Sequence, residues 1–386
     1  MKPLLLSVNL EFFHKILNWK NIEYELVGNL IKVKGFNDYN RIIDINSIFS
    51  SYPFGHPIDR TNTIHSPFKY KVLRDWKIPT TPILFDDVVK NRVDYYNTKD
   101  CKLNLCWSGG LDSTCMLVGF LKYSNDLSKL RVIYSPYSEY ENRNFLALLK
   151  KDYPQVELMD ISGTVYLDTV FDGMFINGHC GDEFTSSLDD SFYERVTGDG
   201  LFSSWKDYFL QQSNDPSLIE FAENYFAKSG KRIDTLLEAR WWFYASNKSQ
   251  VFPITDSLFT SNQSDYNVDN TQGFYDTYDF ESYMYFNTDQ IISNRHDYKT
   301  HKQFMKEYIY AFDHNDDYYL NSRKNNSRQF GIYTRKKICM TDSRWIAKLD
   351  DSTIIRTPNL PLFSRIEFER LYSNSLDYLF NGAPNV

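Results

Sequence analysis

The chain has 386 residues, and its content of 42% hydrophobic and 24% charged residues is typical of a folded protein of two or three domains. The 43 basic and 50 acidic residues give a net charge of −7, which argues against broad nucleic-acid binding but leaves room for a local basic groove. Five cysteines without a CxxC pair argue against a disulfide framework, and no apolar run reaches the roughly 18 residues that span a bilayer, so we expect a cytoplasmic protein without a membrane partner.

Residues 1–97 are expected to form a small amino-terminal α+β or β domain. Gly28-Asn29 stands between two β-rich segments within residues 24–36, a pattern that predicts a hairpin. Residues 50–68 are rich in proline, glycine, serine and threonine, and we expect them to form a loop.

Residues 98–345 are expected to form an α/β domain. Between residues 102 and 184, short apolar runs alternate with segments of helical length and spacing. Strands are predicted over 103–107, 131–136, 156–161 and 174–179, and helices over 113–123 and 140–153. This alternation predicts parallel strands joined by right-handed crossovers, which is a Rossmann-like sheet.

The part of the chain beyond residue 200 is expected to be largely helical. Helices are predicted over 218–229, 235–247 and 300–312, and a polar surface loop is predicted over 261–273. Residues 346–386 are interpreted as a carboxyl-terminal extension that packs on the α/β domain.

A glycine-rich turn follows the first predicted strand of the α/β domain. It holds Ser108, Gly109, Gly110, Leu111, Asp112 and Ser113. A strand that ends in such a turn and starts a helix gathers backbone N–H groups around one point, where the helix dipole also favours a phosphate. The two glycines allow close backbone approach, and the two serines can add hydroxyl donors.

The aspartate of this turn, Asp112, would repel a bare phosphate. Its presence makes sense if Mg²⁺ lies between the carboxylate and the phosphates. The alternative is a tight turn in which Asp112 or Ser113 caps the helix, but capping alone requires neither two glycines nor two serines. We therefore favour a nucleotide site.

The six residues resemble the SGGxDS loop of the N-type ATP pyrophosphatases, a superfamily with the adenine nucleotide α-hydrolase-like fold. The resemblance implies that the loop holds the β- and γ-phosphates of ATP. It also implies that an acceptor attacks the α-phosphate, which yields AMP and pyrophosphate.

A second cluster follows the strand predicted over 174–179. Gly178, His179, Gly181, Asp182 and Glu183 resemble the GxGxDE element of the asparagine synthetase-like members of this superfamily. The resemblance implies that Asp182 binds the Mg²⁺ of ATP together with Asp112, and Gly178 is expected beside the nucleotide. The alternative is a loop with a solvated acidic pair.

A third region resembles the same subfamily. Gly273 to Thr277 resemble its PFLD segment, and residues 302–307 resemble its K-x-x-L-R-E helix, which implies that Lys302 contacts phosphates during adenylation. Lys324 resembles the lysine of an R-x-K element. The alternative for Lys299, Lys302 and Lys306 is a solvated helix face.

The chain departs from the subfamily at several positions. The glutamine-dependent relatives begin with Met-Cys, whereas this chain begins with Met1-Lys2-Pro3, so we expect no glutaminase nucleophile. His179 stands where an acidic residue is usual, and Asp269 and Thr271 replace a glutamate and an arginine before the PFLD-like segment. Aspartate as the acceptor is therefore in doubt.

The function expected from these features is an AMP-forming ligase that uses ATP and Mg²⁺. The acceptor would be a small molecule or peptide with a carboxylate or amide, and the donor would be ammonia or an amine, which a separate amidotransferase could supply. His179 is either the base for the amine or a structural histidine. Two alternatives are sulfur transfer or base modification through Cys180, and an inactive ATP-binding relative.

Overall fold

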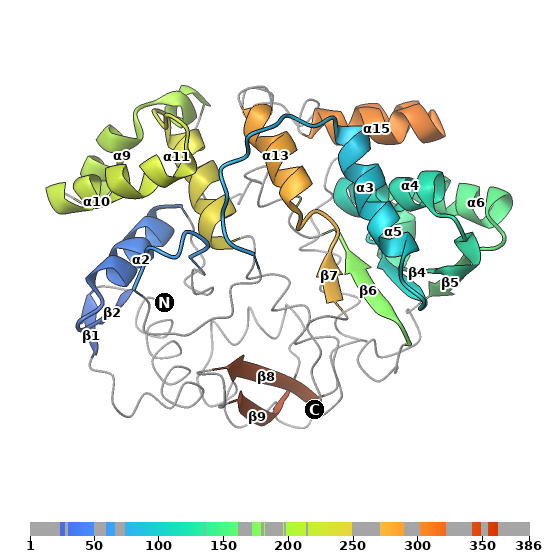
Figure 1. The fold of residues 1–386 in the computed structure, drawn as a ribbon, viewed down its shortest axis with the longest axis horizontal. Coiled ribbons are helices and arrows are strands. Elements are labelled where there is room, and N and C mark those ends of the chain that lie inside the picture. Colours follow the sequence, from blue (N-terminus) through green and yellow to red (C-terminus); the bar gives the residue numbers. More distant parts are fainter. Residues whose placement is uncertain are drawn as a thin grey trace.

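The fold is given by a computed structural model (Figure 1). The structure describes residues 24–27, 30–49, 59–65, 74–134, 136–160, 172–178, 181, 196, 198–213, 215–248, 271–288, 302–321, 342–348 and 354–361. None of the helices within these ranges has the length and apolar content that crossing a membrane requires.

A sheet of five parallel strands forms the centre of the α/β part. The strands are β3 (Leu103–Cys106), β4 (Leu130–Tyr134), β5 (Glu157–Asp160), β6 (Met174–Asn177) and β7 (Thr271–Gly273). Their order is β5-β4-β3-β6-β7, so the chain starts in the middle, moves to one edge, and then returns to the other side of β3. The predicted Rossmann-like parallel sheet is confirmed.

Helices cover this sheet and bury its apolar strands. They include α3 (Phe85–Asn97), α4 (Leu111–Tyr123), α6 (Arg143–Asp152), α13 (Tyr278–Phe286) and α15 (Gln303–Asp313). All residues from 113 to 121 in α4 are buried, because α4 packs against both α3 and α15 as well as joining two strands of the sheet. A helix that is apolar on every side is stable only in such a position.

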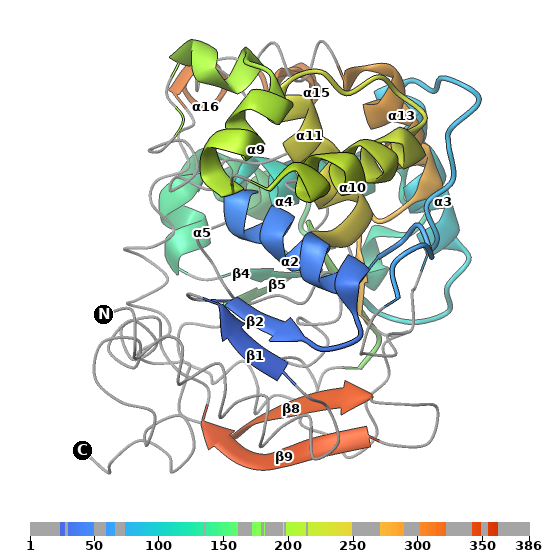
Figure 2. The ribbon, with the colours of Figure 1, turned by 90° about the vertical axis from the view of Figure 1, so that its left-hand side faces the viewer.

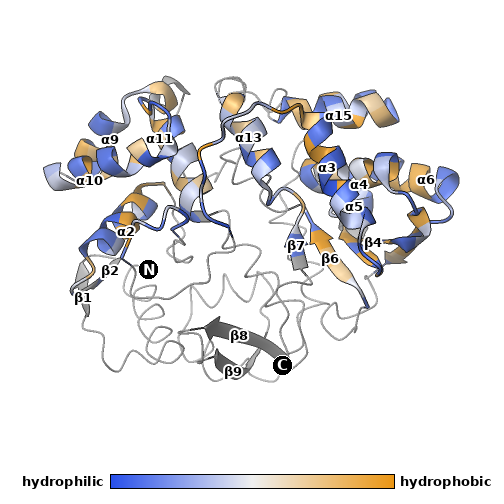
Figure 3. Ribbon diagram, in the orientation of Figure 1, coloured by the Kyte–Doolittle hydropathy of each residue, from blue (hydrophilic) through white to orange (hydrophobic). Residues whose placement is uncertain are grey.

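Two predicted boundaries differ from the structure. The helix predicted over 140–153 is two helices, α5 (Pro136–Glu141) and α6, because the side chain of Asn142 accepts a hydrogen bond from the Phe145 N–H and starts a new helix. The prediction of a loop over 261–273 is wrong for its last three residues, which form β7. Figure 3 shows β6 in the hydrophobic colour and the coloured part of β7 in the hydrophilic one, so β7 lacks the apolar run on which a strand prediction depends.

A second hydrophobic core lies among four helices away from the sheet. They are α2 (Asn37–Phe49), α9 (Trp205–Ser213), α10 (Pro216–Phe226) and α11 (Leu236–Phe243). Figure 2 shows α2 beside α10. The predicted helices over 218–229 and 235–247 are confirmed as α10 and α11, and Thr235 and Glu238 form a capping box that starts α11.

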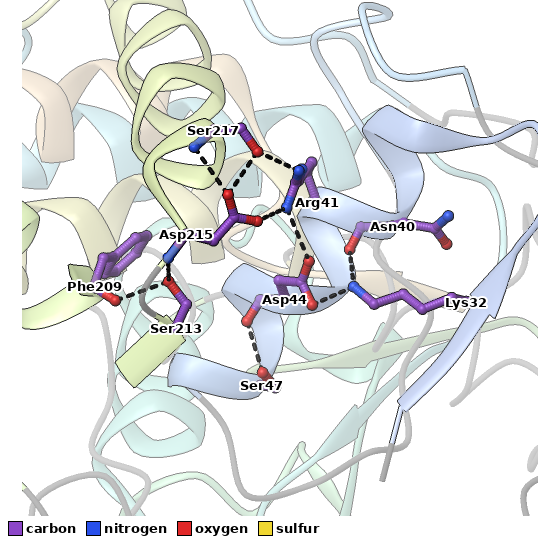
Figure 4. A network of polar contacts seen from close by, with 9 residues as sticks. All are labelled: Lys32, Asn40, Arg41, Asp44, Ser47, Phe209, Ser213, Asp215 and Ser217. Carbon is purple, nitrogen blue, oxygen red and sulfur yellow. Dashed lines mark hydrogen bonds and ion pairs between the residues drawn. The ribbon is translucent and has the colours of Figure 1, made fainter. Parts of the chain in front are cut away.

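The hairpin predicted around Gly28-Asn29 is confirmed as β1 (Tyr24–Val27) and β2 (Leu30–Val33). A polar network joins this hairpin to α2 and α10 (Figure 4). The ammonium of Lys32 pairs with Asp44 of α2, and the guanidinium of Arg41 pairs with Asp215, the N-cap of α10. A cavity of about 480 Å³ lies beside these groups. A second hairpin forms from β8 (Asp342–Lys348) and β9 (Ile354–Pro361).

A buried ion cluster ties the segment before α3 to α13. The guanidinium of Arg60 and the carboxylate of Glu281 are 0% and 1% exposed and form an ion pair. Arg74 pairs with the same carboxylate, at 2.5 Å, and with Asp276. The guanidinium of Arg60 also lies 5.7 Å from the ring centroid of Trp76, which packs against both hydrophobic cores.

We expect the variant Glu281→Gln to lose about 3 kcal/mol of unfolding free energy, because it leaves the buried guanidinium of Arg60 without its carboxylate partner and removes one of the two carboxylates that pair with Arg74. Urea denaturation would measure this loss. The matched control is Asp94→Asn, which removes the exposed ion pair with Lys90 and should leave the denaturation midpoint unchanged. Equal effects of the two substitutions would contradict the prediction.

Candidate functional site

The serine–glycine loop, residues 108–113, lies at the carboxyl end of β3. This strand is the central one of the sheet, and its neighbours β4 and β6 are reached by crossovers in opposite directions. The carboxyl end of such a strand is the switch point at which open α/β sheets bind their ligands. The six loop residues among those predicted to bind the cofactor therefore lie at the edge of the sheet where such ligands bind.

The loop requires a glycine at its second position. Gly109 has a φ of +80°, in the left-handed region. A Cβ atom there would lie 2.5 Å from the carbonyl oxygen of Ser138 and 2.9 Å from the Cβ of Glu141. A side chain at position 109 would therefore be strained by the backbone and would also collide with α5.

The amino-terminal end of α4 is not capped by a side chain. The N-cap residue is Gly110, and no side-chain hydrogen bond caps the helix. The alternative that Asp112 or Ser113 is the N-cap is therefore wrong. The N–H groups in the first turn of a helix have no partner within the helix, so this end of α4 offers donors and a positive dipole to an anion.

The two serines of the loop brace its backbone. Their hydroxyl groups lie 3.0 Å apart, and the hydroxyl of Ser113 also donates to the Gly110 carbonyl at 3.1 Å. The N–H of Gly110 donates to the Ser108 hydroxyl at 3.3 Å. The side chain of Leu111 packs against the core, so this residue can offer a ligand only its backbone.

The strongest electrostatic contact in the site joins Asp112 to Lys302. The Lys302 Nζ lies 2.6 Å and 2.5 Å from the two carboxylate oxygens. The lysine side chain is 3% exposed, whereas the aspartate side chain is 20% exposed. Lys302 directly precedes α15 in a left-handed conformation, with φ 51° and ψ 40°.

The lysines of α15 do not form a solvated face. Lys302 and Lys306 are both buried, so the solvated-stripe alternative is wrong for these two residues. Lys299 lies outside the described residues. Burying an ammonium group costs free energy unless an opposite charge compensates it. Two buried lysines four residues apart are therefore unusual.

The loop after β6 reaches the same place. A Cβ atom on Gly178 would lie 2.9 Å from the Ser113 nitrogen and 3.1 Å from the Asp112 Cβ. A Cβ atom on Gly181 would overlap the Asp112 carboxylate. The structure therefore brings Gly178 beside the serine–glycine loop, and its expected role in binding the nucleotide stays a prediction.

Three predicted site residues lie outside the part of the chain that the structure describes. They are His179, Asp182 and Lys324. A metal ion shared by Asp112 and Asp182 therefore stays a prediction, although Gly181, the neighbour of Asp182 in the chain, lies against Asp112.

Three residues that sequence reasoning missed also contact the loop. The hydroxyl of Tyr275 donates to the Asp112 carbonyl at 2.8 Å, and the hydroxyl of Tyr318 donates to the Gly109 carbonyl at 2.8 Å. Glu141 packs over the two glycines. Tyr275 lies in the segment that resembles PFLD, so a signal existed for it, whereas no pattern marks Glu141 or Tyr318.

A scan of protein-family models and a search of curated proteins found no match to the chain. The functional interpretation therefore depends on the loop sequence and on the contacts that surround it.

We expect Gly109→Ala to destabilise the chain by about 2 to 5 kcal/mol, because it combines a left-handed alanine with a collision at the Ser138 carbonyl. The matched control is Gly35→Ala. Gly35 has the same φ of +80°, but nothing lies within 4 Å of its added Cβ, so it should lose only about 1 to 2 kcal/mol. Urea denaturation of both variants would separate the two contributions, and equal losses would argue against a collision.

Proposed function

We propose that the chain is an ATP-dependent, AMP-forming ligase. The observation that carries the proposal is the ion pair between Lys302 and Asp112, because it joins a buried lysine from a distant helix to an SGGLDS loop at the sheet's switch point. A structural turn needs no buried ammonium at its aspartate, whereas a site for a triphosphate needs both a cation and a ligand for a metal ion.

The uncapped end of α4 and Lys302 together suit the β- and γ-phosphates of ATP. Backbone N–H groups of the first turn supply fixed donors, and the helix dipole adds to them. The ammonium of Lys302 supplies a full positive charge within reach of the loop. These groups stabilise negative charge that develops on the departing pyrophosphate.

The reaction proceeds in two displacements. A carboxylate or amide oxygen of the acceptor attacks the α-phosphorus, a new P–O bond forms, and the bond to the β-phosphate oxygen breaks to release pyrophosphate. Ammonia or an amine then attacks the activated carbon, and the C–O bond to AMP breaks. The amine loses a proton to a base, for which His179 is the proposed residue.

The magnesium ion that the resemblance implies fits Asp112. Its carboxylate is the type of oxygen ligand that Mg²⁺ prefers, and its side chain is partly exposed. Each carboxylate oxygen has two lone pairs, so the group can hold the ammonium of Lys302 and a cation together. Among the described residues, no group of three or more His, Cys, Asp or Glu side chains could hold a metal ion. When bound, the ion neutralises charge on the phosphate oxygens.

We expect Lys302→Met to reduce pyrophosphate release from ATP and Mg²⁺ by 10²- to 10³-fold, because the variant removes the cation that faces the leaving group. The assay needs a panel of carboxylate and amide acceptors. Lys122→Met is the matched control, since Lys122 lies at the other end of α4 and pairs with Asp86. Its rate should equal that of the unaltered protein.

The assay also tests the proposal itself. If the unaltered chain releases no pyrophosphate with any acceptor but binds ATP, the ligase proposal is wrong and a nucleotide-binding regulator replaces it. If Lys122→Met and Lys302→Met are equally slow, the loss reflects general damage and Lys302 has no special role.

The same ion pair predicts that Lys302→Met changes the affinities for ATP and for free Mg²⁺ in opposite directions. In Lys302→Met, ATP should bind more weakly because a phosphate contact is lost. Mg²⁺ added without nucleotide should bind more tightly, because Asp112 no longer shares its oxygens with an ammonium. Isothermal titration calorimetry would measure the dissociation constants of ATP and of Mg²⁺. A change in the same direction for both would contradict the prediction.

A further inference from the structure

Three carbonyl groups of the serine–glycine loop have hydrogen-bond partners on the protein side. The Gly109 carbonyl accepts from the Tyr318 hydroxyl, and the Asp112 carbonyl accepts from the Tyr275 hydroxyl, each at 2.8 Å. The Gly110 carbonyl accepts from the Thr114 N–H at 2.9 Å and from Ser113. A carbonyl oxygen directed at a bound phosphate would repel it, so hydrogen bonds that hold these carbonyl groups on the protein side favour the binding of an anion.

The two tyrosines come from different parts of the chain and meet the loop at its two ends. Tyr275 follows β7, and Tyr318 belongs to α16 (Asp316–Asn321). Their residues are 1% and 7% exposed, so neither hydroxyl can turn to solvent without unpacking its ring. Burial raises the pKa of both hydroxyl groups, which keeps them protonated as hydrogen-bond donors.

Both rings are fixed by their surroundings. The ring of Tyr275 lies between Phe274 and Phe280, with centroids at 5.1 Å and 4.7 Å. The side chain of Tyr318 belongs to the hydrophobic core around the sheet, and its backbone N–H donates to the Asn315 side chain at the start of α16. The position of each hydroxyl is therefore set by packing before any ligand arrives.

We infer that Tyr275 and Tyr318 are positioning residues for phosphate binding. Their hydroxyls anchor the loop backbone at Gly109 and at Asp112 and so hold it in one conformation. They act through the loop backbone and need not touch the nucleotide. The inference rests on the proposed function, because it assumes that the ligand carries phosphates.

The test uses Tyr275→Phe and Tyr318→Phe, which remove one hydroxyl each and keep the ring. Calorimetry would measure the dissociation constants of Mg²⁺-ATP and of AMP, which lacks the phosphates that the loop would hold. We expect ATP to bind about tenfold more weakly in each variant, the size of one lost hydrogen bond, and AMP to change less than twofold.

The matched control is Tyr225→Phe in the second core. Tyr225 is 2% exposed and its hydroxyl lies 2.6 Å from the Ser246 Oγ, so the control loses a comparable buried hydroxyl far from the loop. It should lower the melting temperature as the other variants do, yet leave ATP affinity unchanged. A purely structural role would make all three variants behave alike.

The possible outcomes separate the inference from the proposed function. Unchanged ATP affinity in a folded variant, or equal weakening of ATP and AMP, would overturn the positioning role. If the unaltered chain does not bind ATP, the proposed function fails instead. Since each tyrosine meets a different end of the loop, one folded variant is enough to decide, and its melting curve shows that it is folded.

Discussion

The ion pair between Asp112 and Lys302 is the contact on which the interpretation of this structure depends. It brings the start of α15 to the start of α4, at the carboxyl end of β3, and so joins two places 190 residues apart in the sequence. An ammonium that is 3% exposed needs a partner, and the aspartate that follows two glycines and a leucine provides it. This ion pair therefore has two roles. It holds the start of α15 against α4, and it places a positive charge beside the serine–glycine loop.

The other contacts of the loop follow from its crowded position. Glycine is required where the loop approaches α5 and where the loop after β6 approaches Asp112, because each added Cβ would collide with backbone or carboxylate atoms. The hydroxyls of Tyr275 and Tyr318 then satisfy carbonyl groups that these close approaches cut off from water. The loop is thus held from three sides by elements that are far apart in the sequence.

The sequence predicted the parts of this arrangement that local pattern controls. The strands and the buried helix α4 follow from apolar runs, and Gly109 follows from the turn that joins them. Lys302 was found only through a motif resemblance, and its burial could not be predicted, because helical spacing alone equally fits a solvated stripe. Tyr318 reaches the loop through tertiary packing, which leaves no local trace. β7 consists of Thr271, Gln272 and Gly273 and holds no hydrophobic side chain, so the sequence gives no apolar pattern for its pairing with β6.

The backbone conformation of Lys302 shows a conflict between the stability of the fold and the need for a positive charge at the site. A lysine in the left-handed region is strained by roughly 1 to 2 kcal/mol, and glycine would relieve that strain. Glycine would also remove a desolvated charge from the interior. Evolution toward greater thermal tolerance would favour this replacement if the position had only an architectural task. A lysine kept at this position in homologous proteins would therefore indicate selection for activity at the expense of stability.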